Sequence, residues 1–356
     1  MTNAPSIDVI IGVDTHKEVH TAVAISGSGA HLAATAIPAS NKGYAALEAW
    51  AKAMGEIRAF GIEGTVSCGA GLSRFLRERG QAVFEVNRPN RQLRYQKGKS
   101  DAVDAESAAR SVLAGQAVGQ PKSGTGTVEK IRHLKIARDT AVKSRTQAMQ
   151  TLKAMIVCSP DALREQLDQV SGKMTLVRRL AALRPGPLTS TLASAKTSLR
   201  AIARRWLLLD AEIKQHDAHL ETLTAARAPE LLKAHGMATG TAAEMMLLVG
   251  DNPERIHSEA AFAKLCGVCP LPASSGKTNR HRLNRGGNRQ ANAALYRVVI
   301  VRMRGHQPTL DYLRRGTAEG KSKSEIIRCL KRYVAREIFG YLCGKPALAD
   351  VPATSP

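Results

Sequence analysis

The longest periodic pattern in this 356-residue chain lies between residues 192 and 223. Mostly apolar residues recur there in steps of three and four: Leu192, Ala195, Leu199, Ile202, Trp206, Leu209, Ile213, His216, Leu220 and Leu223. This spacing is typical of a heptad seam, so we expect a long helix that pairs with another helix. The partner is either the basic helical segment of residues 127–158 or a second copy of the chain. We interpret His216 as a polar residue that sets the register of the seam.

The charge balance is the strongest indication of a partner. The chain has 52 Lys and Arg against 30 Asp and Glu, a formal net charge of +22. An excess of this size favours a polyanion as partner, and nucleic acid is the commonest one. Only 4% of the residues are aromatic, which favours contact with the nucleic-acid backbone over base stacking. No apolar run is long enough to span a bilayer and no secretory leader is apparent, so we expect a cytoplasmic protein with no membrane partner.

The first 86 residues show strand and helix patterns in alternation. The segments that predict strands are 7–13, 19–25, 31–37, 57–62 and 81–86, and those that predict helices are 42–54 and 72–79. The first strand ends on Asp14, and the fourth ends on Glu63. Three antiparallel strands followed by alternating helices and strands describe a ribonuclease-H-like α/β fold, and the rest of the chain reads as helical. The expected fold class is therefore α/β plus α.

Asp101 and Asp104 begin the next predicted helix, where a spacing of three places both carboxylates on one face. Such a pair is also typical of surface charge that the helix dipole favours. In the predicted topology, however, Asp14 and Glu63 lie at the ends of neighbouring strands beside this helix. Four converging carboxylates are a ligand set for one or two Mg²⁺ ions. A basic run just upstream could hold a phosphate chain against the metal: Arg88, Arg91, Arg94, Lys97 and Lys99.

A second basic region lies near the C-terminus. Between Ala273 and Arg304 there are eight Lys and Arg residues and no acid, a density that favours a bound polyanion because it otherwise repels itself. A polar loop spans 272–288, and helices are predicted over 289–303 and 324–342. The candidate nucleic-acid contacts here are Lys277, Arg280, Arg282, Arg285 and Arg289. Cys266 and Cys269 have C-x-x-C spacing without a second ligand pair, so we interpret them as packing residues.

Taken in order, these residues resemble the insertion-sequence-110 family of transposases, also called DEDD transposases or bridge-RNA-guided serine recombinases. The resemblance rests on the order and spacing of four blocks, which span nearly the whole chain. They are Ile11-Gly-Val-Asp14-Thr-His-Lys17, Ile62-Glu63-Gly64-Thr65, Lys99-Ser-Asp101-Ala-Val-Asp104-Ala105, and a distal block from Phe262-Ala-Lys-Leu-Cys-Gly267 through Pro270 and Ser275-Gly276 to Arg285-Gly-Gly-Asn288.

The resemblance implies a RuvC-like domain at 1–120 in which Asp14, Glu63, Asp101 and Asp104 hold Mg²⁺. It also implies a C-terminal transposase domain at 231–344 with Ser275 as nucleophile. The heptad seam predicts a helical coiled-coil assembly region at 121–230, and we expect the tail, 345–356, to be disordered. The implied activity is cleavage and rejoining of donor and target DNA by a homo-oligomer, a dimer or tetramer. An element-encoded guide RNA is implied as a further partner, and the bacterial nucleoid as the location of the DNA-bound protein.

Two alternatives remain open from the residues themselves. A plain RuvC-like endonuclease would use the four carboxylates and water, with Ser275 as a bystander. An actin-like ATPase also begins with Gly-x-Asp-x-x-Lys after a first strand, as Gly12, Asp14 and Lys17 do here, but its second phosphate loop is missing. The serine needs an activating group from elsewhere, since no His and Asp partners lie near it in the sequence.

Overall fold

The computed structural model describes residues 8–86, 98, 100–117, 119–277 and 281–344. They form two compact units. The first comprises the chain up to residue 126 together with 249–262, and the second comprises 127–248 and the chain from 263 onward. Within the described part of the chain, no helix combines the length and the apolar character that a membrane crossing requires.

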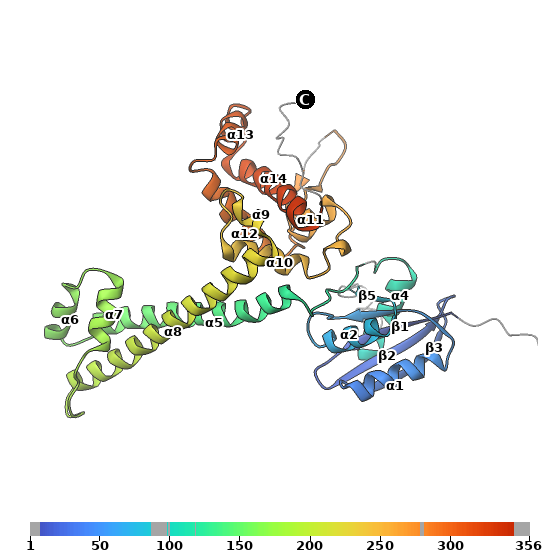
Figure 1. Ribbon diagram of the computed structural model, residues 1–356, viewed down its shortest axis with the longest axis horizontal. Coiled ribbons are helices and arrows are strands. Elements are labelled where there is room, and N and C mark those ends of the chain that lie inside the picture. Colours follow the sequence, from blue (N-terminus) through green and yellow to red (C-terminus); the bar gives the residue numbers. More distant parts are fainter. Residues whose placement is uncertain (1–7, 87–97, 99, 118, 278–280, 345–356) are drawn as a thin grey trace, which may run out of the picture. The chain divides into compact units, whose positions relative to one another are not determined.

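The first unit is built on a five-stranded sheet (Figure 1). Its strands are β1 (Asp8–Thr15), β2 (Val19–Ser26), β3 (His31–Pro38), β4 (Glu56–Glu63) and β5 (Val83–Val86). The strand order is β3-β2-β1-β4-β5. β2 is antiparallel to both β1 and β3, whereas β4 is parallel to β1 and β5 is parallel to β4. The parallel pairing brings the carboxyl ends of β1 and β4 to the same edge of the sheet.

Helices cover both faces of this sheet because both faces of its central strands are apolar. Val9, Ile11 and Val13 of β1 pack with residues of α1 (Asn41–Lys52) and α2 (Ala70–Glu78). Ile10 of β1 packs on the opposite face with Ala105 of α4 (Asp101–Leu113). Burial on both faces explains the continuous β-branched sequence of the first strand.

Glycines in the two central strands let α4 approach the sheet closely. A Cβ atom on Gly12 of β1 would lie 1.9 Å from the backbone oxygen of Ala105 and 2.4 Å from the backbone nitrogen of Ala109. A Cβ atom on Gly61 of β4 would lie 2.9 Å from the backbone oxygen of Ala108. Only glycine fits at such distances, and the small alanines on α4 complete the contact. The helix that carries Asp101 is therefore fixed against β1 and β4, whose carboxyl ends carry Asp14 and Glu63.

Residues 249–262 belong to the first unit although they are distant in sequence from the sheet. The backbone nitrogen of Gly126 donates to Oδ2 of Asp251 at 3.1 Å, and that of Ser123 donates to Oδ1 of Asn252 at 3.0 Å. Nδ2 of Asn252 in turn donates to the backbone oxygen of Pro121 at 3.0 Å. These three bonds fasten the segment 121–126 to a stretch of chain about 125 residues further on.

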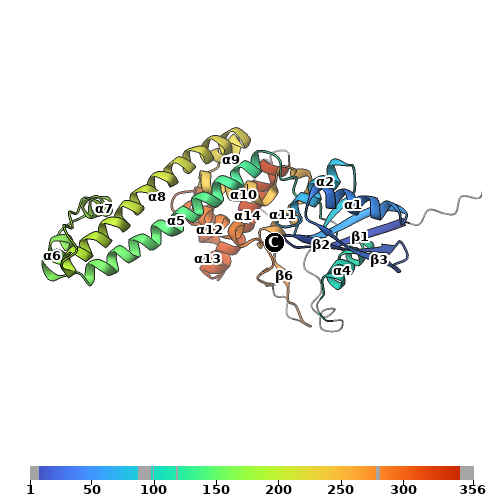
Figure 2. The ribbon, with the colours of Figure 1, turned by 90° about the horizontal axis from the view of Figure 1, so that it is seen from below.

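Two long helices, α5 (Thr127–Val157) and α8 (Thr191–Arg227), form the main feature of the second unit (Figure 2). They run antiparallel, as their ion pairs show: Arg138 of α5 meets Asp217 of α8 at 2.5 Å, and Arg145 meets Asp210. Every residue of the predicted seam is buried or half-buried. The partner of the seam helix is therefore the basic helix of the same chain, one of the two partners that the sequence left open.

The end of this helix pair is closed by two short helices, α6 (Asp161–Asp168) and α7 (Lys173–Ala181). Leu163 and Val177 from these helices pack with Leu152 of α5 and with Trp206 of α8 in one apolar cluster. The connection between the long helices thus forms a cap on the pair.

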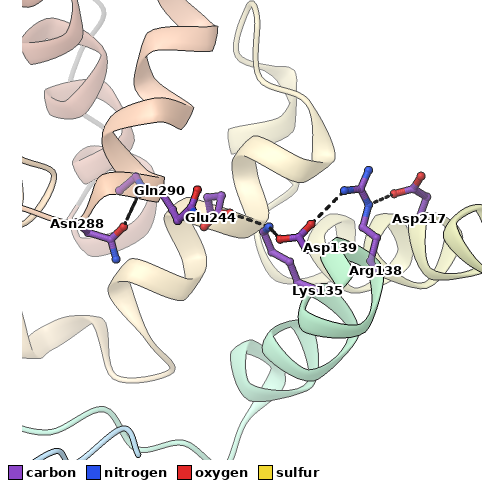
Figure 3. Close-up of polar contacts among 8 residues, drawn as sticks. Lys135, Arg138, Asp139, Asp217, Glu244, Asn288 and Gln290 are labelled. Carbon is purple, nitrogen blue, oxygen red and sulfur yellow. Dashed lines mark hydrogen bonds and ion pairs between the residues drawn. The ribbon is translucent and has the colours of Figure 1, made fainter. Parts of the chain in front are cut away.

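Ion pairs join the basic helix α5 to its neighbours (Figure 3). Nζ of Lys135 lies 2.6 Å from Oε1 of Glu244 in α10 (Thr239–Val249) and 2.5 Å from Oδ2 of Asp139. The side chains of Lys135 and Glu244 are only 11% and 12% exposed, so this pair is nearly removed from water. The positive charges of α5 therefore serve partly to bind other helices of the same unit.

Eight further elements complete the described part of the chain. They are α9 (Pro229–Lys233), the 3₁₀ helix η1 (Pro253–Arg255), α11 (Glu259–Leu265), β6 (Leu271–Pro272), β7 (His281–Arg282), α12 (Arg289–Arg302), α13 (Gln307–Ala318) and α14 (Lys323–Cys343). α12 packs on α14, and Arg302 makes a two-pronged ion pair with Glu337 at 2.7 and 2.9 Å.

The glycine pair of Arg285-Gly-Gly-Asn288 has a packing role. A Cβ atom on Gly287 would lie 2.1 Å from the backbone nitrogen of Gly267, so the two glycines are in close backbone contact. Asn288 caps α12 by accepting from the backbone nitrogens of Gln290 and Ala291 at 2.9 and 3.0 Å (Figure 3). Cys266 next to this contact is fully buried, and burial raises the pKa of its thiol to about 12. It occupies a packing position, as the sequence indicated.

The sequence predicts the larger elements to within a few residues, and the structure also contains elements that were not predicted. The predicted strands and the long helices correspond to β1 to β5, α5 and α8. The helices α6, α7, α9 and α13 were missed, and the predicted polar loop of 272–288 contains part of the two-stranded ribbon β6 and β7. The expected disordered tail, 345–356, lies outside the described residues.

Candidate functional site

The carboxyl ends of β1 and β4 place two acids side by side. Val13 is paired with Ile62 in the parallel register, so Asp14 and Glu63, the residues that follow, come next on the two strands. Side chains alternate along a strand, so both acids share the face of the sheet that α4 covers. Oγ1 of Thr15 donates to the backbone oxygen of Glu63 at 2.8 Å and ties the two strand ends together.

The other two acids begin α4. Ser100 caps the helix by accepting from the backbone nitrogen of Val103, and Asp101 and Asp104 lie in the first turn, where the helix dipole favours negative charge. Asp104 is 4% exposed, whereas the side chain of Asp101 is 55% exposed. A buried and an exposed carboxylate on one helix turn give the site an inner and an outer acid.

The structure brings Asp14 and Asp101 together around His16, which the sequence analysis did not select. Nε2 of His16 lies 3.3 Å from Oδ2 of Asp14 and 3.5 Å from Oδ1 of Asp101. His16 belongs to the three-residue connection between β1 and β2, where a single histidine gives no periodic signal. In the sequence it was marked only by its place in the block Ile11-Gly-Val-Asp14-Thr-His-Lys17, two residues after Asp14.

Electrostatics at Asp14 agree with this convergence. Burial raises the pKa of the Asp14 carboxyl, and the negative charges of Asp101 and Asp104 raise it further, while His16 lowers it. Carboxylates that repel one another in this way favour a bound cation. The three acids therefore form one electrostatic group, although they come from segments about 87 residues apart.

The residues present fit a divalent metal ion. One ligand atom from each of Asp14, His16 and Asp101 lies within 4.8 Å of the other two, and these three make up the one group of potential metal ligands found among the described residues. Carboxylate oxygens suit Mg²⁺ and similar ions, and imidazole nitrogen suits transition metals.

The candidate nucleophile lies in the second unit. Ser275 is exposed, in the loop that joins β6 to β7, and Gly276 after it adopts a φ of +54°. Four of the basic candidates are exposed on the same loop or just after it: Lys277, Arg282, Arg285 and Arg289. These side chains are accessible to a ligand.

The remaining basic candidates fall outside the described residues. They are Arg88, Arg91, Arg94, Lys97 and Lys99 before α4, and Arg280 in the β6–β7 loop. Their assignment as nucleic-acid contacts stays a prediction from the sequence.

Comparison with known proteins defines the class. A model of DEDD transposases of IS110 elements, described as "Transposase", matches residues 11–157, and one described as "Transposase IS116/IS110/IS902 family" matches residues 228–314. Both describe transposases, and the first covers all four acids. The chain belongs to the IS110 family of transposases.

One curated relative is the "Insertion element IS110 uncharacterized 43.6 kDa protein" of Streptomyces coelicolor. It is 28% identical to this chain over 158 residues, which are 44% of this chain and 38% of the relative. The match thus spans well under half of the relative's length. Family membership implies use of a divalent metal, which agrees with the ligand group at Asp14.

Proposed function

We propose that this protein is a DNA transposase that cleaves and rejoins strands at the ends of an insertion element. The observation that carries the proposal is the meeting of Asp14 and Asp101, from a strand end and a helix start, in a chain of a transposase family. We further propose that residues 1–120 are a RuvC-like domain, because the strand order β3-β2-β1-β4-β5 with three antiparallel strands agrees with a ribonuclease-H-like sheet.

The four acids would hold the metal ion, proposed to be Mg²⁺. Asp14 and Glu63 would supply oxygens from the sheet, and Asp101 and Asp104 would supply oxygens from α4. A cation held there would neutralise phosphate charge and lower the pKa of an attacking hydroxyl. The chain would contribute by holding the sheet and α4 in a fixed relative position, through the close contacts of Gly12 and Gly61 with the backbone of α4.

Ser275 would act as the nucleophile on a DNA phosphate. Its Oγ forms a bond to phosphorus as the bond to one deoxyribose oxygen breaks; the serine proton leaves, and the departing oxygen takes up a proton to become a hydroxyl end. The covalent phosphoserine conserves the phosphodiester energy, so a hydroxyl from another strand can rejoin the DNA without ATP. Lys277, Arg282 and Arg285 are exposed on the same loop as this serine or just after it, and they would stabilise the charge that develops on the phosphate.

The proposed partners follow from the charge of +22 and from the family. Donor and target DNA are the substrates, and an element-encoded guide RNA would select them. Joining two DNA molecules requires at least two active sites, so we propose a homo-oligomer, a dimer or tetramer. The division into a catalytic region at 1–120, a helical assembly region at 121–230 and a serine region at 231–344 is part of this proposal.

The test is formation of a covalent protein–DNA adduct. Wild type, Ser275→Ala and Asp101→Ala are incubated with Mg²⁺, element-end DNA and RNA transcribed from the element's flanks, and the products are separated on denaturing gels. Ser274→Ala and Asp161→Ala are matched controls, a neighbouring loop serine and an exposed aspartate in the first turn of α6. We expect an adduct with wild type and both controls, and none with Ser275→Ala or Asp101→Ala.

The same experiment separates the alternatives. Cleavage without an adduct that survives in Ser275→Ala but is lost in Asp101→Ala would make the protein a metal-dependent endonuclease that uses water. An adduct with Asp101→Ala would remove the metal site from the mechanism. Mixing the Ser275→Ala and Asp101→Ala proteins adds one point: an adduct restored in the mixture would mean that the serine and the acids of different copies work together.

A further inference from the structure

His16 is held beside the acids by the backbone of a tight connection. Thr15 pairs with His20 at the end of the β1–β2 ladder, and the backbone nitrogen of His16 donates to the backbone oxygen of Val19 at 3.2 Å. The imidazole is 57% exposed, so burial of apolar surface does not explain its position. It has a fixed backbone, an accessible ring and a nitrogen directed at two carboxylates.

The distances around Nε2 match metal ligation better than hydrogen bonding. Charge-assisted hydrogen bonds from nitrogen to carboxylate are usually about 2.7–2.9 Å long, whereas Nε2 of His16 lies 3.3 Å from Asp14 and 3.5 Å from Asp101. Ligand atoms placed about 2.1 Å from one metal ion are about 3.0 Å apart at neighbouring octahedral positions and about 3.4 Å apart in a tetrahedron. The observed spacing therefore leaves room for an ion among the three atoms.

We propose that His16 is a nitrogen ligand of the metal ion held by Asp14 and Asp101, and that it makes this site bind Mn²⁺ in preference to Mg²⁺. The inference rests on the metal site of the proposed function and refines the identity of its ion. Mg²⁺ prefers oxygen ligands and gives up its water reluctantly. Mn²⁺ suits carboxylate oxygen as Mg²⁺ does, but it also belongs to the first-row transition series, whose ions bind mixed nitrogen and oxygen sites, so it gains from His16 what Mg²⁺ does not.

The test measures binding of the metal ion to the protein directly and does not depend on DNA cleavage. Full-length wild type, His16→Ala and Asp101→Ala are titrated with Mn²⁺, and free Mn²⁺ is followed by its electron paramagnetic resonance signal. Pulsed measurements on the bound ion then detect coupling to imidazole ¹⁴N. His31→Ala is the matched control, an exposed histidine at the start of β3 in the same sheet. Competition with Mg²⁺ gives the affinity for the second metal.

In wild type and His31→Ala we expect bound Mn²⁺ with ¹⁴N coupling. In His16→Ala we expect the coupling to disappear and the Mn²⁺ dissociation constant to rise about tenfold or more, with the Mg²⁺ constant changed less than about threefold. Mn²⁺ that binds through Asp101 but shows no ¹⁴N coupling in wild type would overturn the inference and leave the proposed metal site intact. Mn²⁺ binding that is unchanged in Asp101→Ala would overturn both.

Discussion

Replacing Gly12 by Ala tests how the sheet positions the acids of α4. The added Cβ would lie 1.9 Å from the Ala105 oxygen, against the 3.4 Å at which ordinary contact begins, a shortfall of about 1.5 Å. The obstructing atoms belong to the helix backbone and cannot rotate away, so α4 has to move. The φ angle of Gly12 is not positive, so alanine is compatible with the strand itself and the contact alone carries the effect.

The expected loss of folding free energy follows from this shortfall in the contact distance. Overpacking by one methyl group destabilises a protein by about 1–3 kcal/mol, and a contact with rigid backbone favours the upper end, about 3 kcal/mol. A functional site tolerates displacements of only about 0.5 Å, so a helix shift of about 1.5 Å should weaken metal binding by about tenfold or more. Gly61→Ala, whose Cβ would lie 2.7 Å from Cγ2 of Val112, should cost less, about 1–2 kcal/mol.

The assay uses urea unfolding followed by tryptophan fluorescence. Trp50 packs against the core of the first unit, and Trp206 lies in the second, so a Trp206→Phe background makes the signal report on the first unit. Gly119→Ala is the control, because the nearest atom to its Cβ would be 3.9 Å away. A loss of unfolding free energy that is largest for Gly12→Ala, smaller for Gly61→Ala and smallest for Gly119→Ala would support the reasoning. A Gly12→Ala protein with unfolding free energy within about 0.5 kcal/mol of the parent and unchanged metal affinity would refute it.

Three further variants test other contacts. A hydrogen bond from Lys52 lowers the pKa of Glu48 in the folded protein. The ionised Glu48 therefore stabilises the fold above about pH 4.5, and this stabilisation is lost as the pH falls through the pKa of the folded state. Glu48→Gln should remove this pH dependence of the unfolding free energy measured in urea, and an unchanged pH profile would contradict the prediction. Gly287→Ala should destabilise the second unit by about 1–3 kcal/mol through its contact with Gly267, measured by calorimetry, with a neutral result counting against that contact. Glu244→Gln should cost about 1–3 kcal/mol by removing a charge partner of Lys135, and a loss below about 0.5 kcal/mol would mean that the pair adds little.

The sequence predicted strands and helices correctly where their burial produces a regular pattern of apolar residues. The run that ends on Asp14 is β-branched because both faces of β1 are buried, and the steps of three and four that lead to Leu223 follow from one buried stripe on α8. Strand ends carry acids at Asp14 and Glu63, so the approach of Asp14 to Asp101 on α4 could be argued from the topology alone, whereas the place of Glu63 in the metal site stays a prediction.

The rest depended on contacts that leave no periodic trace. A glycine within a strand pattern, such as Gly12, indicates only a low propensity for strand. Its role depends on α4, which packs closely against it. His16 in a short connection is typical of a solvated side chain, and its distance to Asp101 depends on a helix that begins 85 residues later. The strands β6 and β7 have two residues each, too few to show alternation.

The hydrogen bonds from Gly126 to Asp251 and from Ser123 to Asn252 also affect the order of events during synthesis. A ribosome adds about 5–20 residues per second, so Asp251 is made about 6–25 s after Gly126. The sheet and α4 have all emerged by then, and the acids of the candidate metal site can assemble while the segment 121–126 still lacks its fastening. In the nascent chain, the acids of the candidate site can therefore meet before the unit that contains them is complete.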